Sequence, residues 1–374
     1  MDLARKVGQL FVVPANADVM RHVRENHVGG VIWFESTTAE VKRVTAELQA
    51  AAEIPLLVSA DLESGMGMRF TDATWWPSAM ALAATGDVAL AEEQARISAV
   101  EARGIGVNHI LAPVADVNVD PKNPVINTRS FGEDPHTVAQ FVAAYVRGIN
   151  SGGCLSTAKH YPGHGDTHVD SHRALPVLDV TRERLEAVEL VPFRAAIEAG
   201  VSSVMMGHLA VPALDDTPAP VRAEFENVYG TTHGEVTHGG TLPATVSRRM
   251  IGLLRRDFDG LVITDSFDMG GLAAHFDAGE AAVRGIEAGE DQILFSTDTD
   301  MAIRAVLAAV RSGRITESRI DESVERILRA KRGGQAILPV QDRQDCLSST
   351  FVAERAMTLV RDTEGLLPAR NYKI

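Results

Sequence analysis

The chain has 374 residues, of which 45% are hydrophobic and 23% are charged, a composition typical of a soluble globular protein with a sizeable core. Its 50 acidic and 36 basic side chains give a formal net charge of −14, and the sequence contains no dense cluster of Lys and Arg. Proteins that bind a nucleic-acid backbone are normally basic or carry a basic face, so we expect no nucleic-acid partner and favour a small neutral substrate.

The number of cysteines and the length of the apolar stretches indicate in which cellular compartment the protein is expected. Cys154 and Cys346 are the only cysteines, and two scattered cysteines do not form a disulfide framework. No apolar stretch approaches the roughly 18 residues of a membrane helix. The first residues lack the apolar core and small-residue cleavage site of a signal peptide. We therefore expect a cytoplasmic protein without membrane association, unless a leader precedes this chain.

Short apolar runs recur along the chain, and most are separated by helical patterns. The predicted strands are Val7–Val13, Val28–Phe34, Pro55–Ala60, Val107–Val114, Cys154–Ala158, Val201–Met206, Leu261–Thr264 and Gln292–Phe295. The predicted helices include Asp87–Arg103, His136–Ser151, Arg182–Ala199, Gly279–Ala288 and Asp300–Ser312. Most of the strands are continuously apolar rather than alternating, which is typical of parallel strands covered by helices on both faces.

Eight such β-then-α units within residues 1–335 predict an α/β fold, a (β/α)8 TIM-type catalytic barrel. A doubly wound open sheet is the structural alternative. Residues 336–374 fall outside the barrel count. They contain one helical stretch and the apolar run Thr358–Val360, and they could form the first unit of a second domain that this chain does not contain.

Polar residues follow several of the predicted strands directly. In barrels of this kind the chemistry takes place where strands run out into the loops before the helices. The polar residues at these positions, from strand three to strand seven, are Asp61, Glu63, Asp116, Lys159, His160, His208 and Asp265. Any one of them could be an ordinary loop residue or a helix N-cap. Five strands that end in this way favour a functional site at one end of the barrel.

The densest group of polar residues is the segment 159–172, KHYPGHGDTHVDSH. Its four histidines recur at every fourth position, which on a helix would place them on one face and suggest a metal site. Pro162, Gly163 and Gly165 break a helical pattern, so we expect a long loop over the barrel mouth instead.

Asp170 and His172 lie at the end of this loop. A carboxylate two residues from an imidazole can accept a hydrogen bond from one ring nitrogen, stabilise the imidazolium and leave the other nitrogen to carry a proton. The alternative is an Asx-type turn with a solvated histidine.

Asp265 directly follows the seventh predicted strand, where its position would be rigid. A carboxylate there can attack the anomeric carbon of a sugar and form a covalent glycosyl-enzyme. Asp268 is a competing candidate that we place in the following loop or at the start of the next helix. Arg129, after the fourth strand, could bind a hydroxyl or carboxylate of a ligand or form a structural salt bridge. The following Asp134-Pro135 is typical of a helix start.

Taken together, these segments resemble glycoside hydrolase family 3, in particular its β-N-acetylglucosaminidase branch, over most of residues 1–333. The similar segments, in order, are Val7–Phe11, Val28–Ile32, Asp61–Gly65, Ala112–Val117, Arg129–Pro135, the loop 159–172 and Pro192–Phe193. The long loop that ends in Asp-Ser-His is the most specific of them. It looks like the hallmark that separates this branch from the β-glucosidases and β-xylosidases of the family.

The resemblance implies a retaining exo-β-N-acetylglucosaminidase that needs no metal or organic cofactor. By position, it implies that Asp265 is the nucleophile and that His172, oriented by Asp170, is the acid/base. It implies roles in sugar binding for Asp61, Arg129, Lys159, His160 and His208. The implied partner is a small carbohydrate, either a cell-wall muropeptide in peptidoglycan turnover or a chitooligosaccharide, and we expect a monomer or weak homo-oligomer.

Three alternatives remain open at this point. A neutral imidazole repels phosphate less than a second carboxylate would, so the chain could be a β-N-acetylglucosaminide phosphorylase. A β-glucosidase of the same family is a weaker alternative. A catalytically silent barrel that binds sugars or a protein is the third, although Asp265, Asp170 and His172 are all present.

Overall fold

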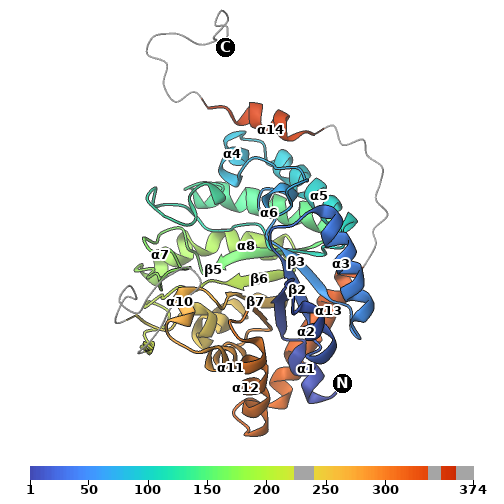
Figure 1. Ribbon diagram of the computed structural model, residues 1–374. Helices are drawn as coiled ribbons and strands as arrows, with labels where there is room; N and C mark the ends of the chain where they lie inside the picture. The colour runs from blue at the N-terminus through green and yellow to red at the C-terminus, as the bar shows by residue number, and fades with distance from the viewer. Residues whose placement is uncertain (223–239, 336–346, 359–374) are drawn as a thin grey trace, which may run out of the picture.

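The computed structural model describes residues 1–222, 240–335 and 347–358, and its strands form one closed parallel barrel (Figure 1). Each strand pairs with the next in the chain, and β8 pairs with β1 to close the barrel. The strands are β1 Phe11–Pro14, β2 Gly30–Trp33, β3 Leu57–Ala60, β4 His109–Ile110, β5 Leu155–Tyr161, β6 Ser203–Met206, β7 Leu261–Ser266 and β8 Gln292–Leu294. The predicted (β/α)8 barrel is confirmed, and the open sheet is excluded.

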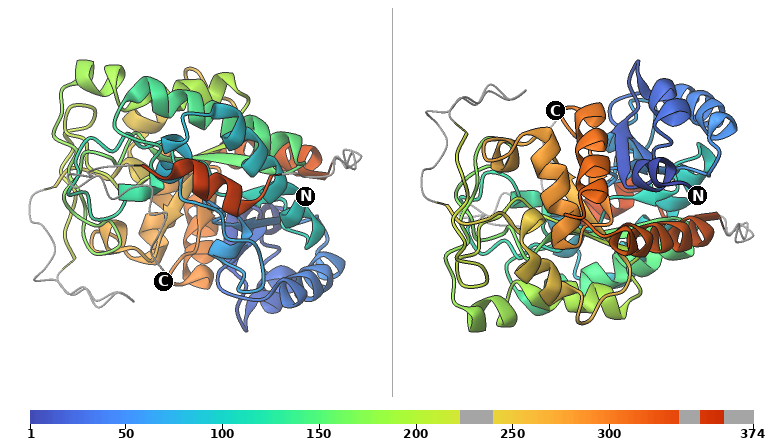
Figure 2. Two further views of the ribbon diagram at one scale, coloured as in Figure 1. Left: turned by 90° about the horizontal axis from the view of Figure 1, so that it is seen from above. Right: turned by 90° about the horizontal axis from the view of Figure 1, so that it is seen from below.

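The helices lie around the outside of the strands, as the views from above and below show (Figure 2). The α-helices are α1 Leu3–Gly8, α2 Val19–Glu25, α3 Thr38–Ala51, α4 Ala79–Ala84, α5 Val88–Gly104, α6 Pro135–Ser151, α7 Arg182–Ala187, α8 Leu190–Glu198, α9 Arg248–Leu254, α10 Gly270–Ala273, α11 Ala278–Ala288, α12 Thr299–Arg311, α13 Glu317–Gln335 and α14 Ser349–Ala356. The short 3-10 helices are η1 Met66–Met68, η2 Asn127–Arg129 and η4 Ala244–Val246.

The barrel core follows from the continuous apolar runs of the sequence. Most strand residues are buried, because each strand faces the barrel interior on one side and a helix on the other. The helices begin at polar caps, as at α6, where the Asp134 carboxylate accepts a 2.7 Å hydrogen bond from the Thr137 amide and Pro135 takes the first position. The predicted start of this helix is therefore confirmed.

Two predicted elements are wrong in their bounds, and each has a local cause. The first predicted strand began at Val7, but Val7 and Gly8 belong to α1, a short helix capped by the Asp2 side chain. The predicted helix 182–199 is two helices, α7 and α8. A proline inside a continuous helix would clash with the carbonyl four residues earlier, and the restart at Leu190 places Pro192 in the first turn of α8.

Strands β4 and β5 also differ from the prediction. The run 107–114 contains only two strand residues, and Pro113 has no amide to donate beyond them. Strand β5 continues past the predicted end at Ala158 to Tyr161, so Lys159 and His160 lie within the strand rather than after it. Their backbone is therefore held by the barrel itself.

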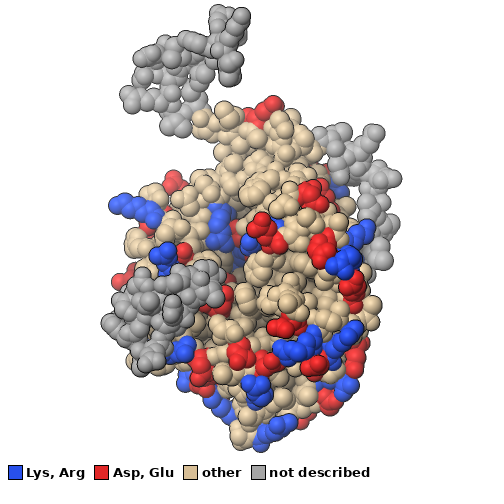
Figure 3. Space-filling model, viewed as in Figure 1, with Lys and Arg blue, Asp and Glu red and all other residues tan. Residues whose placement is uncertain are grey.

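After the barrel, α14 packs against α4 through a fully buried Val352, and Figures 1 and 2 show the two helices together. The predicted helical stretch beyond residue 335 is thus present, at Ser349–Ala356. Leu359 and Val360, part of the apolar run predicted after it, lie outside the described residues. Basic and acidic side chains are interspersed over the face of the molecule in Figure 3.

Candidate active site

A cavity of about 620 Å³ opens where the strands end. Its walls come from the ends of strands and the loops that follow them, which is where a barrel of this type carries its chemistry. Six of the eight residues predicted for the site line this cavity, namely Asp61, Arg129, Lys159, His160, His172 and Asp265. The structure therefore brings together residues that are up to 204 positions apart in the chain.

His172 is held by the Asp170 carboxylate. Asp170 Oδ1 accepts from the ring Nδ1 of His172 at 2.7 Å and from its backbone amide at 2.9 Å, so the Asx-type turn and the side-chain pair are present together. Burial lowers the pKa of His172, but the Asp170 hydrogen bond and the charges of Asp265 and Asp170 outweigh it, and the net pKa is raised. This side chain is 39% exposed and lines the cavity.

Asp265 is the fifth of the six residues of β7, and the Ser266 amide donates a hydrogen bond to its Oδ1 at 2.8 Å. Burial raises the pKa of Asp265, but the nearby imidazoles of His160, His208 and His172 and the Ser266 amide together lower it. The carboxylate is therefore held in its anionic form, as a nucleophile requires.

The competing carboxylate, Asp268, lies in the turn after β7 and also lines the cavity. It accepts a 2.7 Å hydrogen bond from the Ser266 hydroxyl. Burial raises the pKa of Asp268, and the charge of Asp265 raises it further. The pKa values of the two carboxyl groups are thus shifted in opposite directions, and the anionic form is favoured at Asp265.

A cluster of buried and partly buried charges forms another part of the cavity wall. Lys159, only 2% exposed, lies 2.7 Å from both Asp61 Oδ1 and Glu63 Oε1. Arg129 forms a bidentate pair with Glu63, at 2.9 Å and 2.8 Å, and Arg69 pairs with Asp61 at 2.8 Å. From the sequence, Arg129 could either form a structural salt bridge or bind a ligand. In the structure it forms the salt bridge with Glu63, and its side chain also lines the cavity.

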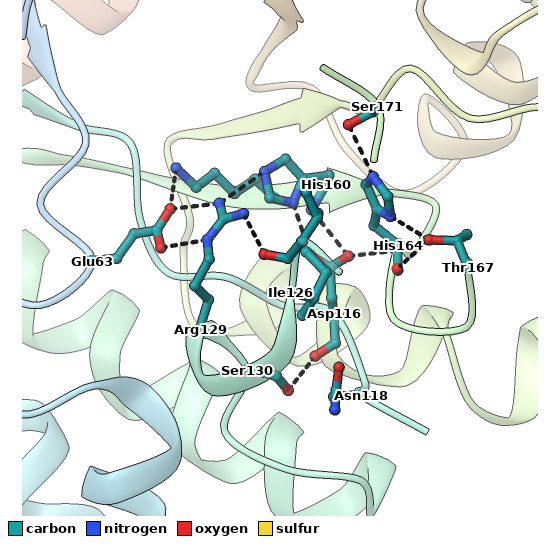
Figure 4. Close-up of polar contacts among 12 residues, drawn as sticks. Glu63, Asp116, Asn118, Ile126, Arg129, Ser130, His160, His164, Thr167 and Ser171 are labelled. Carbon is teal, nitrogen blue, oxygen red and sulfur yellow. Dashed lines mark hydrogen bonds and ion pairs between the residues drawn. The ribbon is translucent and has the colours of Figure 1, made fainter. Parts of the chain in front are cut away.

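Glu63 and Asp116 also take part in this network (Figure 4), although the sequence places them only among the polar residues at strand ends, with no specific role. Asp116, fully buried, accepts from His160 Nδ1 at 2.8 Å and from the backbone amide of His164 at 2.7 Å. The signal for Asp116 was an acid inside the apolar run 112–117, because a buried charge requires partners. Glu63 had only its position beside Asp61.

His208 and Asp170 are not among the residues that line the cavity. The Nε2 of His208 donates to the Ser266 carbonyl at 2.8 Å, and its Nδ1 lies 3.0 Å from the Thr245 hydroxyl. Burial lowers the pKa of His208, which favours its neutral form, and its hydrogen bond to Ser266 supports the end of β7. Its direct contact with substrate stays a prediction.

The four regularly spaced histidines do not converge on one point. His168 is exposed and pairs with Asp120 at 2.8 Å. His164 is buried, and its ring makes an edge-to-face contact with the ring of His160, with centroids 6.0 Å apart. Within residues 1–222, 240–335 and 347–358, no group of three His, Cys, Asp or Glu side chains is arranged to hold a metal ion.

A TIM-type barrel whose cavity is lined by an anionic Asp and by a His that a second Asp holds has the features of a glycoside hydrolase. The family model described as Glycosyl hydrolase family 3 N terminal domain matches residues 2–330. The chain belongs to glycosyl hydrolase family 3.

Known proteins resemble the chain over nearly its whole length. A Cellulomonas fimi protein named Beta-N-acetylglucosaminidase/beta-glucosidase is 36% identical over 383 residues, which cover 97% of this chain and 65% of that protein. The solved structure of a family 3 beta-N-acetylglucosaminidase from Paenibacillus sp. str. FPU-7 is 39% identical with a TM-score of 0.83, covering 95% of this chain and 68% of that one. A structure named Beta-glucoside phosphorylase BglX is 28% identical with a TM-score of 0.80, covering 95% and 61%.

The chain thus spans 65% of the length of the Cellulomonas fimi relative.

Proposed function

We propose that the chain carries the active site of a retaining exo-β-N-acetylglucosaminidase. The observation that supports this most is the single cavity lined by both the anionic Asp265 and His172, whose ring is held from behind by a hydrogen bond to Asp170. Relatives named as β-N-acetylglucosaminidases supply the sugar class.

In the first proposed step, Asp265 attacks the anomeric carbon and forms a covalent glycosyl-enzyme. His172 donates its Nε2 proton to the departing glycosidic oxygen, so that the aglycone leaves as a neutral alcohol. The Asp170 carboxylate stabilises the imidazolium form before this transfer and fixes the ring through Nδ1.

In the second step, the now neutral His172 takes a proton from water, which attacks the anomeric carbon and releases Asp265. Two inversions at one carbon retain its configuration. In this proposal Asp61, Arg129, Lys159 and His160 bind the sugar hydroxyls and His208 supports the pocket, without metal or organic cofactor.

The test is the Asp265→Asn variant with p-nitrophenyl N-acetyl-β-glucosaminide as substrate. Loss of the nucleophile should lower kcat/KM on the order of 10⁴-fold or more. The matched control is Asp321→Asn, a carboxylate on α13 that pairs with Lys6 far from the cavity, which should keep wild-type turnover. An Asp265→Asn enzyme with wild-type turnover would falsify the assignment.

Phosphorolysis is a second candidate function, favoured by the imidazole in the acid/base position and by the similarity to a protein named as a phosphorylase. A neutral imidazole leaves room for an anionic acceptor that a second carboxylate would repel. We would incubate the enzyme with substrate and millimolar phosphate and follow sugar 1-phosphate by phosphorus NMR. Absence of that product at full turnover eliminates the phosphorylase. The same panel with aryl β-glucosides tests the β-glucosidase alternative.

The aglycone and the wider setting are also proposals. We propose cell-wall muropeptides, as in peptidoglycan turnover, or chitooligosaccharides as natural substrates, and a monomer or weak homo-oligomer in the cytoplasm. We assign residues 1–335 to the catalytic barrel and 336–374 to the start of a second domain. None of the helices in the described part of the chain has the length and apolar character needed to cross a membrane.

A further inference from the structure

The loop after β5 carries the Asp170–His172 pair at residues 170–172, which we call its tip. The side chain of Ser171, between the two, forms a hydrogen bond that holds this tip in place. Ser171 Oγ lies 3.0 Å from His164 Nε2, and both residues are only 1% exposed (Figure 4). Because this hydrogen bond is shielded from water, losing one partner leaves a buried polar atom unsatisfied. The bond joins the start of the loop, just after β5, to its catalytic end.

The direction of this hydrogen bond follows from its neighbours. The Thr167 hydroxyl donates to the His164 carbonyl at 3.0 Å, so its oxygen must accept from His164 Nδ1, which is 2.7 Å away. Burial lowers the pKa of His164 to about 4, so the ring carries one proton at neutral pH, and that proton is on Nδ1. His164 Nε2 is therefore the acceptor, and the Ser171 hydroxyl is the donor.

The same tip is fastened on its other side to the segment that follows Asp265. The amide of Gly270 donates to the His172 carbonyl, and the amide of Gly271 donates to the Ser171 carbonyl, both at 2.9 Å. A Cβ at Gly271 would lie 3.1 Å from that carbonyl oxygen and 3.0 Å from His208 Cβ, so the close approach depends on glycine. The acid/base loop is thus tied to the loop of the candidate nucleophile.

His164 is itself fixed to the sugar-binding side of the cavity. Its backbone amide donates to Asp116, the carboxylate that also accepts from His160 Nδ1 (Figure 4). The tip of the loop is therefore held between two rigid parts of the site, the end of β5 and the start of α10.

We propose that Ser171 and His164 are positioning residues, whose hydrogen bond latches the loop over the cavity and delivers His172 to the glycosidic oxygen. This inference rests on the proposed glycosidase function. Without the latch, the loop spends more time open, and a misplaced proton donor costs catalysis even when the other site residues are intact.

The test compares Ser171→Ala with Ser151→Ala, a hydroxyl deletion at the end of α6, where the Ser151 hydroxyl donates to the carbonyl of Gly148 in the same helix. The substrates are 2,4-dinitrophenyl, p-nitrophenyl and phenyl N-acetyl-β-glucosaminides. Because only poor leaving groups need protonation, Ser171→Ala should lower kcat/KM about three- to tenfold for the phenyl glycoside and little for the dinitrophenyl one. Simple loss of folded enzyme would lower all three equally.

A second measurement needs no activity. Hydrogen exchange of the Gly270 and Gly271 amides reports directly on the docking of the loop. We expect these amides to exchange about three- to tenfold faster in Ser171→Ala, while the barrel strands and the Ser151→Ala control keep wild-type rates. Gly271→Ala, which crowds the same contact from the other side, should behave like Ser171→Ala.

The outcomes separate the two proposals. Wild-type exchange at Gly270 and Gly271 together with wild-type leaving-group dependence in Ser171→Ala overturns the latch. A wild-type enzyme that hydrolyses none of the glycosides, but whose amides are released by Ser171→Ala, overturns the proposed function and leaves the latch supported.

Discussion

At the scale of single residues, the neighbouring carboxylate of Asp170 acts on His172 through both a hydrogen bond and its charge. Asp170 contributes a 2.7 Å hydrogen bond and a negative charge, and both raise the pKa of His172 against the effect of burial. In the proposed reaction His172 must be protonated, so kcat/KM should fall as the pH rises through its pKa, above the usual value near 6.5.

The variant Asp170→Asn removes this charge and should move the basic limb of the kcat/KM profile to lower pH, by about one unit or more. The pKa of His172 should fall because burial, which lowers it, is unchanged in the variant, whereas the Asp170 charge and hydrogen bond, which raise it, are lost or weakened. The measurement is kcat/KM against pH with a phenyl glycoside, which needs protonation. The acidic limb, set by Asp265, should stay below the ordinary aspartate range, and an unmoved basic limb would contradict the role of Asp170.

How much of the site the sequence predicts depends on how local each signal is. Asp265 and the Asp170–His172 pair could be proposed as candidates because a strand end and a two-residue spacing are visible in the sequence. The bidentate partner of Arg129 could not, because Glu63 lies 66 positions away and only the fold brings the two together. The same holds for Asp116 and for the placement of His208 behind β7.

At the scale of elements, the loop after β5 and the split between α7 and α8 show how prolines and glycines mark the ends of helices. Pro162, Gly163 and Gly165 exclude a helix in the loop, and the structure agrees. Pro192 carried the same kind of signal for α8, but the apolar pattern on both sides hid the break. The end of β5 was missed because Lys159 and His160 are polar, and polar strand residues are buried here only because the cavity network satisfies them.

The start of β8 is fixed by the buried carboxylate of Asp291. It accepts from the Val262 amide of β7 at 3.0 Å and from the Ser323 hydroxyl of α13 at 2.8 Å, and it pairs with Arg255. It therefore joins two neighbouring strands and the helix that covers them.

Replacing this carboxylate by Asp291→Asn should lower the free energy of unfolding by about 3 kcal/mol, since it breaks a buried ion pair from one side. Urea denaturation measures the change. The control is Asp259→Asn, an exposed carboxylate that shares Arg326 with Asp291 and should cost less than about 1 kcal/mol. Equal losses in the two variants would show that burial is not what makes Asp291 important.

At the scale of the whole molecule, the barrel was predictable because its signal is repeated. Eight apolar runs separated by helices specify a closed parallel barrel even when single bounds are wrong, as at α1 and β4. The cavity was not predictable in the same way, because it is formed by side chains from loops that are far apart in sequence. The packing of α14 on α4 is likewise a tertiary contact with no local signal.

The stability of the whole barrel should depend on pH through Glu290, which is fully buried between α11 and β8. Neither of its carboxylate oxygens has a hydrogen-bond partner among the described residues. Burial raises the pKa of Glu290 well above its usual value, and Asp291 raises it further, against Arg255 and Arg319. The folded protein therefore keeps this carboxyl protonated at a pH where the unfolded chain ionises it.

A group with a raised folded pKa contributes its full stability below the unfolded pKa and loses that contribution as the pH rises to the folded pKa. The variant Glu290→Gln cannot ionise at this position. Its free energy of unfolding, relative to that of the wild type, should therefore increase from about pH 4.5 upward, by up to about 1.4 kcal/mol per pH unit. Urea denaturation of both proteins at pH 5, 6 and 7 measures the gap. Any fixed cost of the new amide shifts the whole curve but not its slope, so a gap that stays constant over this range would show that Glu290 is ionised in the folded barrel.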